Sequence, residues 1–280
     1  MAEFAFHQVD VFATRPFGGN PLAVVTGADG LTDAQMAAFA NWTNLSETTF
    51  LLRPTHPDAD YRVRIFTPQQ ELPFAGHPTL GTCHVWLQQG GVPRGRQVVQ
   101  ECPAGLVPVR RQDAMLAFAA PPLRRAGAVE ADVLAAIARG LHLPPDSIRA
   151  SNWADNGPGW VAVMLRSRAE LLSVRPDYAA LGDLKVGLVA PFDTAPDRDD
   201  ALFEVRAFTG GPDGVEDPVT GSLNASLAMW MIGAGLAPPS YVARQGTVLG
   251  RRGRIAITSD AGEIWVGGTV VTAIEGRVTI

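Results

Sequence analysis

Two similar segments occur about half a chain apart, and they differ at residues that can carry out acid–base chemistry. The first, R-I-F-T and then E-L-P-F-A-G-H, ends at His77; the second, R-A-F-T and then E-D-P-V-T-G-S, ends at Ser222. The copies also differ where Leu72 of the first corresponds to Asp217 of the second. An imidazole titrates near neutral pH and a carboxylate accepts protons, so His77 and Asp217 are candidates for proton transfer. Ser222 lies outside any G-x-S-x-G elbow, which favours a role as a helix cap and ligand donor.

Each segment leads into an apolar stretch of helical length. Because proline is favoured at the first helical position, Pro78 predicts a helix over 79–89 with His77 as its N-cap. By the same argument Ser222 caps a helix over 223–232. Two such helix starts facing one cleft would direct unsatisfied N–H groups and positive dipole ends at a small anionic ligand. For either turn alone a structural helix start is the favoured interpretation, and it is the duplication that favours a functional site.

Four carboxylates are candidates for a role near this site, because apolar surroundings raise a carboxyl pKa and hydrogen-bond donors lower it. Glu71 and Glu216 occupy equivalent places in both copies, which favours a shared structural role such as binding turn amides. Asp217 occurs in one copy only and is the better functional candidate. Glu47 enters an otherwise apolar strand, and this pattern alone favours a charge at a sheet edge or a partner for a helix cap.

The composition argues against several classes of partner. A net charge of −5 without a cluster of Lys or Arg indicates no binding to nucleic acid or to an anionic membrane. The first residues lack the basic start and apolar run of a signal peptide, and the apolar stretch 227–239 is too short to span a bilayer. We therefore expect a cytoplasmic protein.

No pattern predicts a metal or a cofactor. Cys83 and Cys102 lack metal-binding spacing and are expected to be buried thiols. His77 and His84 would lie roughly 10 Å apart along one helix, too far to share an ion. The G-G-N turn at 18–20 lacks the G-x-G-x-x-G spacing of a dinucleotide site.

The 280 residues suit two domains. Short strands with frequent Gly and Pro surround two helices that are apolar on all sides, and helices of that kind are usually enclosed. The expected fold is α+β, with two lobes that each wrap a curved antiparallel sheet around one buried helix. The N-terminal lobe is expected over 1–122 and the C-terminal lobe over 123–280, with the last strand free to return to the first lobe.

Four motifs along the chain resemble, in the same order, those of one family. They are D-V-F-x-x-x-P-F-x-G-N-P-L-A-V-V over 10–25, N-L-S-E-T-T-F over 44–50, R-I-F-T-P-x-x-E-L-P-F-A-G-H-P-T-L-G over 64–81 and E-D-P-x-T-G-S over 216–222. The chain is similar over nearly its whole length to the PhzF-like isomerase family of phenazine biosynthesis, within the diaminopimelate epimerase superfamily. The resemblance implies two pseudo-symmetric lobes like those of diaminopimelate epimerase, each a β-barrel-like sheet around a central helix, with the active site between them and a homodimer.

The resemblance also assigns site residues and changes the interpretation of Glu47, which matches the family's catalytic glutamate. Related racemases use two opposed cysteines, but the turn positions here carry a histidine and a serine, so two-thiol racemisation is not expected. The positions that match the family's active site are Glu47, His77, Asp217 and Ser222, and the amides of Gly76 and Gly221 would face the substrate.

The leading hypothesis is a cofactor-independent isomerase that moves a proton on a small cyclic or unsaturated carboxylic acid. In the family's type member this acid is dihydro-hydroxyanthranilate. Glu47 would act as general acid and base, with its pKa raised toward neutrality by enclosure. The alternative is a non-catalytic protein that binds a small carboxylate and keeps the isomerase fold.

Overall fold

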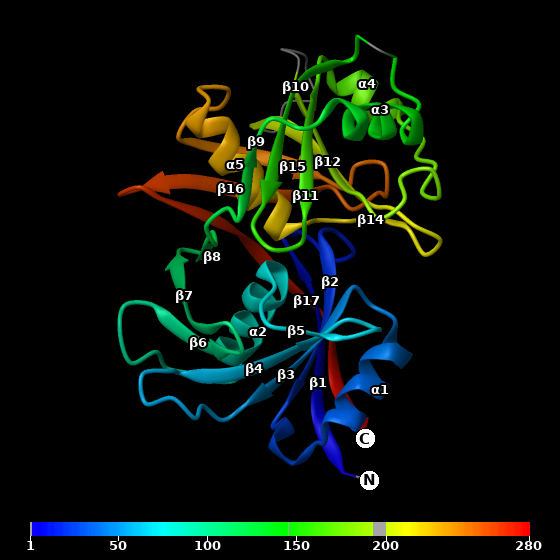
Figure 1. The fold of residues 1–280 in the computed structure, drawn as a ribbon. Coiled ribbons are helices and arrows are strands. Elements are labelled where there is room, and N and C mark those ends of the chain that lie inside the picture. The colour runs from blue at the N-terminus through cyan, green and yellow to red at the C-terminus, as the bar shows by residue number, and fades with distance from the viewer. Residues whose placement is uncertain (1, 145, 193–199) are drawn as a thin grey trace. The chain divides into compact units, whose positions relative to one another are not determined.

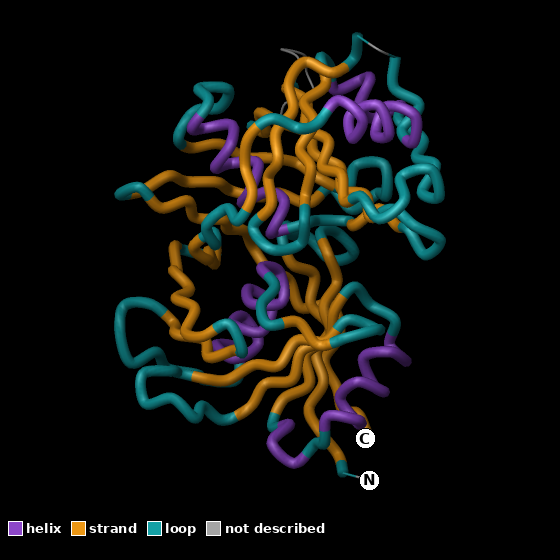
Figure 2. The backbone as a smooth tube through the Cα atoms, viewed as in Figure 1, coloured by secondary structure: helices purple, strands orange, loops and turns teal. Residues whose placement is uncertain are grey.

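The chain forms two compact units. The structure, a computed structural model, describes residues 2–144, 146–192 and 200–280. Unit 1 comprises Met1–Ala119 and Gly267–Ile280, and unit 2 comprises Ala120–Val266. Figure 2 shows that strands make up most of each unit and that helices are few, which confirms the α+β prediction.

Unit 1 is a closed barrel around one helix. Its strands pair in the ring β1–β2–β3–β4–β6–β7–β8–β17, and β17 pairs with β1 to close it. Figure 1 shows α2 enclosed by these strands. The strands are β1 (Glu3–Val11), β2 (Asn20–Thr26), β3 (Glu47–Leu52), β4 (Tyr61–Phe66), β5 (Glu71–Leu72), β6 (Val98–Cys102), β7 (Gly105–Gln112), β8 (Met115–Ala119) and β17 (Glu263–Thr279), and the helices are η1 (Ala28–Gly30), α1 (Asp33–Thr43) and α2 (Gly76–Gln88).

The helix α2 lies very close to the barrel wall. A Cβ atom added at Gly81 would lie 2.5 Å from Leu22 Cδ2 and 3.0 Å from Val11 Cγ2. Glycine at this position therefore lets the helix backbone approach β1 and β2. The helix buries residues around its first three turns, as expected for an enclosed helix without a polar face.

Unit 2 repeats the topology of unit 1. Strands β1–β4 of unit 1 and β10–β13 of unit 2 pair in the same sequence, antiparallel, parallel and antiparallel, and in each unit a later strand, β6 or β15, then pairs parallel with the last of the four. The parallel pairs are a feature that the prediction of purely antiparallel sheets did not include. The strands are β9 (Arg125–Gly127), β10 (Ile148–Asp155), β11 (Trp160–Leu165), β12 (Lys185–Pro191), β13 (Ala201–Thr209), β14 (Val215–Asp217), β15 (Ser240–Gln245) and β16 (Gly253–Asp260), and the helices are α3 (Ala131–Gly140), α4 (Arg168–Ser173) and α5 (Gly221–Gly233).

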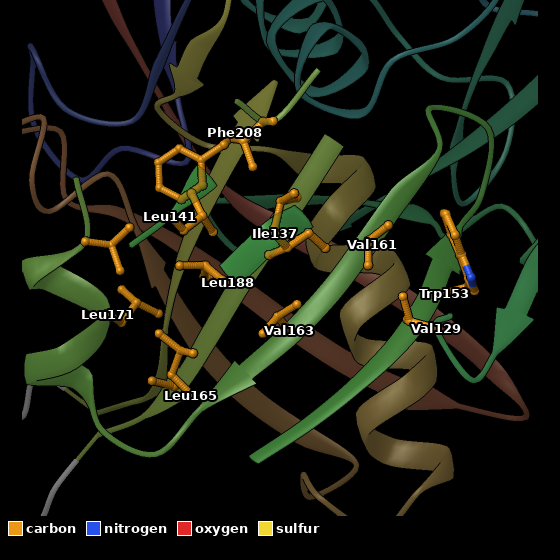
Figure 3. Close-up of a cluster of buried hydrophobic side chains, with 14 residues drawn as sticks. Val129, Ile137, Leu141, Trp153, Val161, Val163, Leu165, Leu171, Leu188 and Phe208 are labelled. Atoms are coloured by element: carbon orange, nitrogen blue, oxygen red, sulfur yellow. The ribbon is translucent and has the colours of Figure 1, made fainter. Parts of the chain in front are cut away.

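Strand β11 is buried on both faces. Val161 and Val163 belong to an apolar cluster that also contains Ile137 of α3 and Leu188 of β12, and Figure 3 shows these side chains together. Because successive side chains of a strand point to opposite faces, Trp160 points away from this cluster. The opposite face of β11 is the one that contacts α5.

Candidate active site

The helix α2 begins at Gly76, with Ala75 as its N-cap. Ala75 has extended backbone angles, and its carbonyl accepts the first helical hydrogen bond from the amide of Thr79 at 3.2 Å. The predicted cap at His77 is therefore wrong, because His77 is the second helical residue. Pro78 is the third helical residue and still lies in the first turn, where backbone N–H groups have no partner within the helix, so the earlier start is compatible with proline.

Gly76 has no room for a side chain. A Cβ atom at this position would lie 2.4 Å from Cζ of the buried Phe118 ring. The ring of Phe118 in turn packs edge-on against Phe74, with centroids 5.7 Å apart. The start of α2 is thus set against an aromatic pair, and only glycine fits there.

Glu47 and His77 lie side by side at one end of the unit 1 barrel. The Nε2 atom of His77 is 3.3 Å from the Oε2 atom of Glu47, and the two side chains are 6% and 16% exposed. Glu47 is on the same face of β3 as Thr49, whose hydroxyl accepts a hydrogen bond from Thr82 of α2 at 2.9 Å. Alternation along β3 therefore places the Glu47 carboxylate on the barrel face that meets α2.

The interpretation of Glu47 as a sheet-edge charge is wrong. Strand β3 pairs with β2 on one side and β4 on the other, so neither of its edges is open. In the register with β2, Glu47 lies opposite Leu22. A carboxylate in this mostly buried position needs a polar partner, and the imidazole of His77 is beside it.

Burial lowers the pKa of His77 to about 3, so its imidazole is neutral at neutral pH. A neutral imidazole carries a proton on one nitrogen and a lone pair on the other. Nε2 of His77 faces Oε2 of Glu47, but the geometry of this contact is not that of a hydrogen bond. A neutral imidazole adds no positive charge beside the carboxylate.

In unit 2 a second group of candidate residues gathers at the start of α5. The helix begins at Gly221 with Thr220 as its N-cap, so the predicted cap at Ser222 is also wrong by two positions. The hydroxyl of Thr220 donates to Oδ2 of Asp217 at 2.5 Å. The hydroxyl of Ser222 accepts a hydrogen bond from Nε1 of Trp160 at 3.1 Å.

Gln245, at the end of β15, holds this turn together. Its Oε1 atom accepts from the amide of Thr220 at 3.0 Å and from Nδ2 of Asn224 at 2.8 Å. Its Nε2 atom donates to the carbonyl of Asp217 at 3.0 Å and to the hydroxyl of Thr220 at 2.9 Å. Sequence reasoning missed Gln245, because a single glutamine at a strand end carries no motif.

The repeated Arg and Glu residues form the same ion pair in both units. The guanidinium of Arg64 donates to both carboxylate oxygens of Glu71 at 2.7 and 2.6 Å, and Arg206 donates to Glu216 at 2.9 and 2.8 Å. The expected role of these glutamates, binding turn amides, is thus replaced by a paired-donor contact with arginine. The ion pair joins β4 to β5 in unit 1 and β13 to β14 in unit 2.

The candidate residues therefore form one group in each unit. Unit 1 contains Glu47, Gly76 and His77, and unit 2 contains Asp217, Gly221 and Ser222. Whether the two groups share one substrate is part of the proposal below.

Other chemistry has little support among the described residues. Cys83 and Cys102 are both buried and free, as expected, and burial raises the pKa of Cys83 to about 12. Within the described ranges no cluster of His, Cys, Asp or Glu is arranged to hold a metal ion. In the same part of the chain, no helix combines the length and apolarity needed to cross a bilayer.

Comparison with known proteins assigns the chain to a family. The profile of the PhzC-PhzF family, described as phenazine biosynthesis-like protein, matches residues 9–276. The trans-2,3-dihydro-3-hydroxyanthranilate isomerase of Pseudomonas aeruginosa is 35% identical, over 96% of this chain and 97% of that protein. The chain belongs to the PhzF family of isomerases.

Two further comparisons concern a relative from fission yeast and a solved structure of the same fold. The Schizosaccharomyces pombe protein named antisense-enhancing sequence 1 is 33% identical, over 99% of each chain. The crystal structure of a PhzF-family protein from Enterococcus faecalis superposes with a TM-score of 0.82 over 100% of both chains, at 24% identity. The PhzF resemblance and the predicted fold class are both confirmed, and the family match covers all four motifs.

Proposed function

We propose that this PhzF-family isomerase moves a proton on a small cyclic or unsaturated carboxylic acid without a cofactor, with Glu47 as general acid and base. The observation that carries the proposal is the 3.3 Å contact between the largely buried Glu47 and a neutral His77. Burial in general disfavours the charged form of a carboxyl group, which favours the uptake of a proton from a substrate.

In the proposed reaction the Glu47 carboxylate removes a proton from one carbon of the substrate. The electron pair of the broken C–H bond shifts through the adjacent double bond. The carboxylic acid of Glu47 then gives the proton to a second carbon, so the atoms and charge of the substrate are unchanged. His77, 3.3 Å from Glu47, orients the carboxyl group by close contact, and one carboxyl group suffices for both steps.

Binding of the substrate is assigned to the two helix starts. The amides of Gly76 and Gly221 and the hydroxyl of Ser222 would bind the substrate carboxylate, and Asp217 would bind its amino or hydroxyl group. This assignment needs the two groups of residues to face one cleft. The relative from Pseudomonas aeruginosa is named for trans-2,3-dihydro-3-hydroxyanthranilate, whose carboxylate, amino and hydroxyl groups suit these donors and acceptors.

The test is the variant Glu47→Gln, assayed by NMR in D₂O with trans-2,3-dihydro-3-hydroxyanthranilate. We expect turnover and deuterium incorporation at carbon to fall by at least about 100-fold, because amide nitrogen cannot accept the proton. The matched control is Glu275→Gln, which changes an exposed carboxylate of the same unit. Wild-type exchange in Glu47→Gln would refute the role of Glu47, and binding without exchange by the wild type would favour the non-catalytic alternative.

The homodimer and the cytoplasmic location stay predictions. Light scattering coupled to size exclusion tests the first, since a dimer would show twice the chain mass of 29.7 kDa. A monomer under assay conditions would contradict it.

A further inference from the structure

The turn between β10 and β11 holds Ser222 at two atoms. Nε1 of Trp160 donates to the Ser222 hydroxyl at 3.1 Å, and Nδ2 of Asn156 donates to the Ser222 carbonyl at 3.0 Å. Both donors are buried, and they stand at the two ends of a short turn. The β10–β11 turn therefore binds Ser222 at both its side chain and its backbone.

The turn itself is fixed by Asp155. Its Oδ1 atom accepts hydrogen bonds from the amides of Gly157 at 2.6 Å and Gly159 at 2.7 Å. Both glycines have positive φ angles, 141° and 91°, which other residues rarely adopt. Trp160 follows directly, and alternation along β11 turns its side chain toward α5 rather than toward the apolar cluster on the other face.

The chemistry of the indole decides the orientation of the serine hydroxyl. An indole nitrogen is a donor only, so Oγ of Ser222 must be the acceptor in this contact. The hydroxyl proton of Ser222 therefore points elsewhere, and among the described residues it has no acceptor. This proton belongs to the second residue of α5, where the first-turn N–H groups also point out of the helix. Donors grouped in this way suit an anion.

We propose that Trp160 is a positioning residue that turns the Ser222 hydroxyl into a donor for the substrate carboxylate. The inference rests on the proposed function, in which Ser222 binds the substrate carboxylate. It adds that the indole of Trp160 makes Ser222 selective for an acid. Hydrogen bonds in series strengthen one another, so the indole donor also makes the serine proton a stronger donor. Asn156 supports the same arrangement by holding the helix backbone at Ser222.

The test compares two probes that differ only in the group at issue. Anthranilate carries a carboxylate, and 2-aminobenzamide carries a neutral amide on the same ring. Calorimetry gives the affinity ratio of acid to amide for each protein, and a partly unfolded sample does not change this ratio. We expect the wild type to prefer the acid, and Trp160→Phe to lower the ratio by about three- to tenfold, as for one lost hydrogen bond.

A matched control and a double variant make the result specific. Trp153→Phe also removes a buried indole donor of unit 2, one that binds Glu130 at 2.8 Å, and it should leave the ratio unchanged. In the Ser222→Ala background, Trp160→Phe should have no further effect, because the two residues act through one contact.

Several results would overturn the inference. One is an acid-to-amide affinity ratio that Trp160→Phe leaves unchanged, or that Trp153→Phe lowers equally. Another is a ratio that Trp160→Phe still lowers in the Ser222→Ala background. A wild type that does not prefer the acid would also overturn the inference. The outcome is separable from that of the proposed function. Glu47→Gln should keep the acid preference while losing proton exchange, so retained exchange in that variant would refute the function and leave the role of Trp160 standing.

Discussion

The Nε2 atom of His77 lies 3.3 Å from the Oε2 atom of Glu47, which joins the start of α2 to the start of β3. The contact is possible because α2 runs inside the barrel and β3 presents Glu47 on the face that meets it. In this mostly buried position a neutral imidazole adds no second charge beside the carboxylate. The roles proposed for both residues rest on this relationship.

The first prediction concerns the pH dependence of stability. The pKa of His77 is about 3 in the folded chain and near 6.5 when exposed, so the unfolded chain binds the proton more tightly between these values. The contribution of His77 is complete above about pH 6.5 and is lost as the pH falls toward 3. We expect His77→Gln to reduce the pH slope of the free energy of unfolding by up to about 1.4 kcal/mol per pH unit in this window.

Urea unfolding of both proteins from pH 3 to pH 8 measures this slope. His7 and His84 also have pKa values lowered by burial, but they are present in both proteins and cancel in the difference. Parallel stability curves for wild type and variant would show that His77 is not buried in its neutral form.

A second prediction concerns Gly76. The variant Gly76→Ala places a methyl group against the Phe118 ring, and we expect it to lose about 1–3 kcal/mol of unfolding free energy by overpacking. The additional change Phe118→Leu should restore part of this loss. Gly30→Ala is the control, since no atom lies within 4 Å of its added Cβ. Equal unfolding free energies for Gly76→Ala and wild type would contradict the packing at the start of α2.

The repeated ion pairs lead to a third prediction, because burial differs between the two copies. The side chains of Arg206 and Glu216 are 2% and 6% exposed, whereas those of Arg64 and Glu71 are 22% and 30% exposed. Arg206→Met leaves a carboxylate buried without its partner, and we expect a loss of about 3–5 kcal/mol. Arg64→Met should cost about 1 kcal/mol or less, because water reaches the remaining carboxylate.

Denaturant unfolding of the two variants measures the difference. The double change Arg206→Met with Glu216→Met should be less destabilising than Arg206→Met alone, since no unpaired charge remains. A larger loss for Arg64→Met than for Arg206→Met would contradict the burial argument.

A fourth prediction concerns Gln245. The variant Gln245→Leu removes the acceptor for the amide of Thr220 and for Asn224, and leaves both donors buried. We expect a loss of about 2 kcal/mol in unfolding free energy and a lower turnover, because the turn that carries Asp217 loosens. Gln112→Leu, at an exposed position, should change neither quantity. Normal turnover in Gln245→Leu would show that the turn keeps its shape without the amide.

The internal repeat, the enclosed character of the two helices and the candidate residues can all be predicted from the amino-acid sequence. It pointed to His77, Asp217 and Ser222 through the differences between the two copies, and to Glu47 only through the resemblance to a family. These features are readable because residue type and short-range spacing set what a side chain can do and which local element it favours.

Which of these residues contact one another depends on the three-dimensional fold of each unit. The starts of α2 and α5 lie before the predicted caps, and the repeated glutamates bind arginines rather than amides. Glu47 lies beside His77, and Trp160 binds Ser222. Each of these contacts joins residues on different elements, so it depends on strand register and on how a buried helix packs against the strands around it. Such pairings arise from burial of the whole unit, and no local pattern in the chain encodes them.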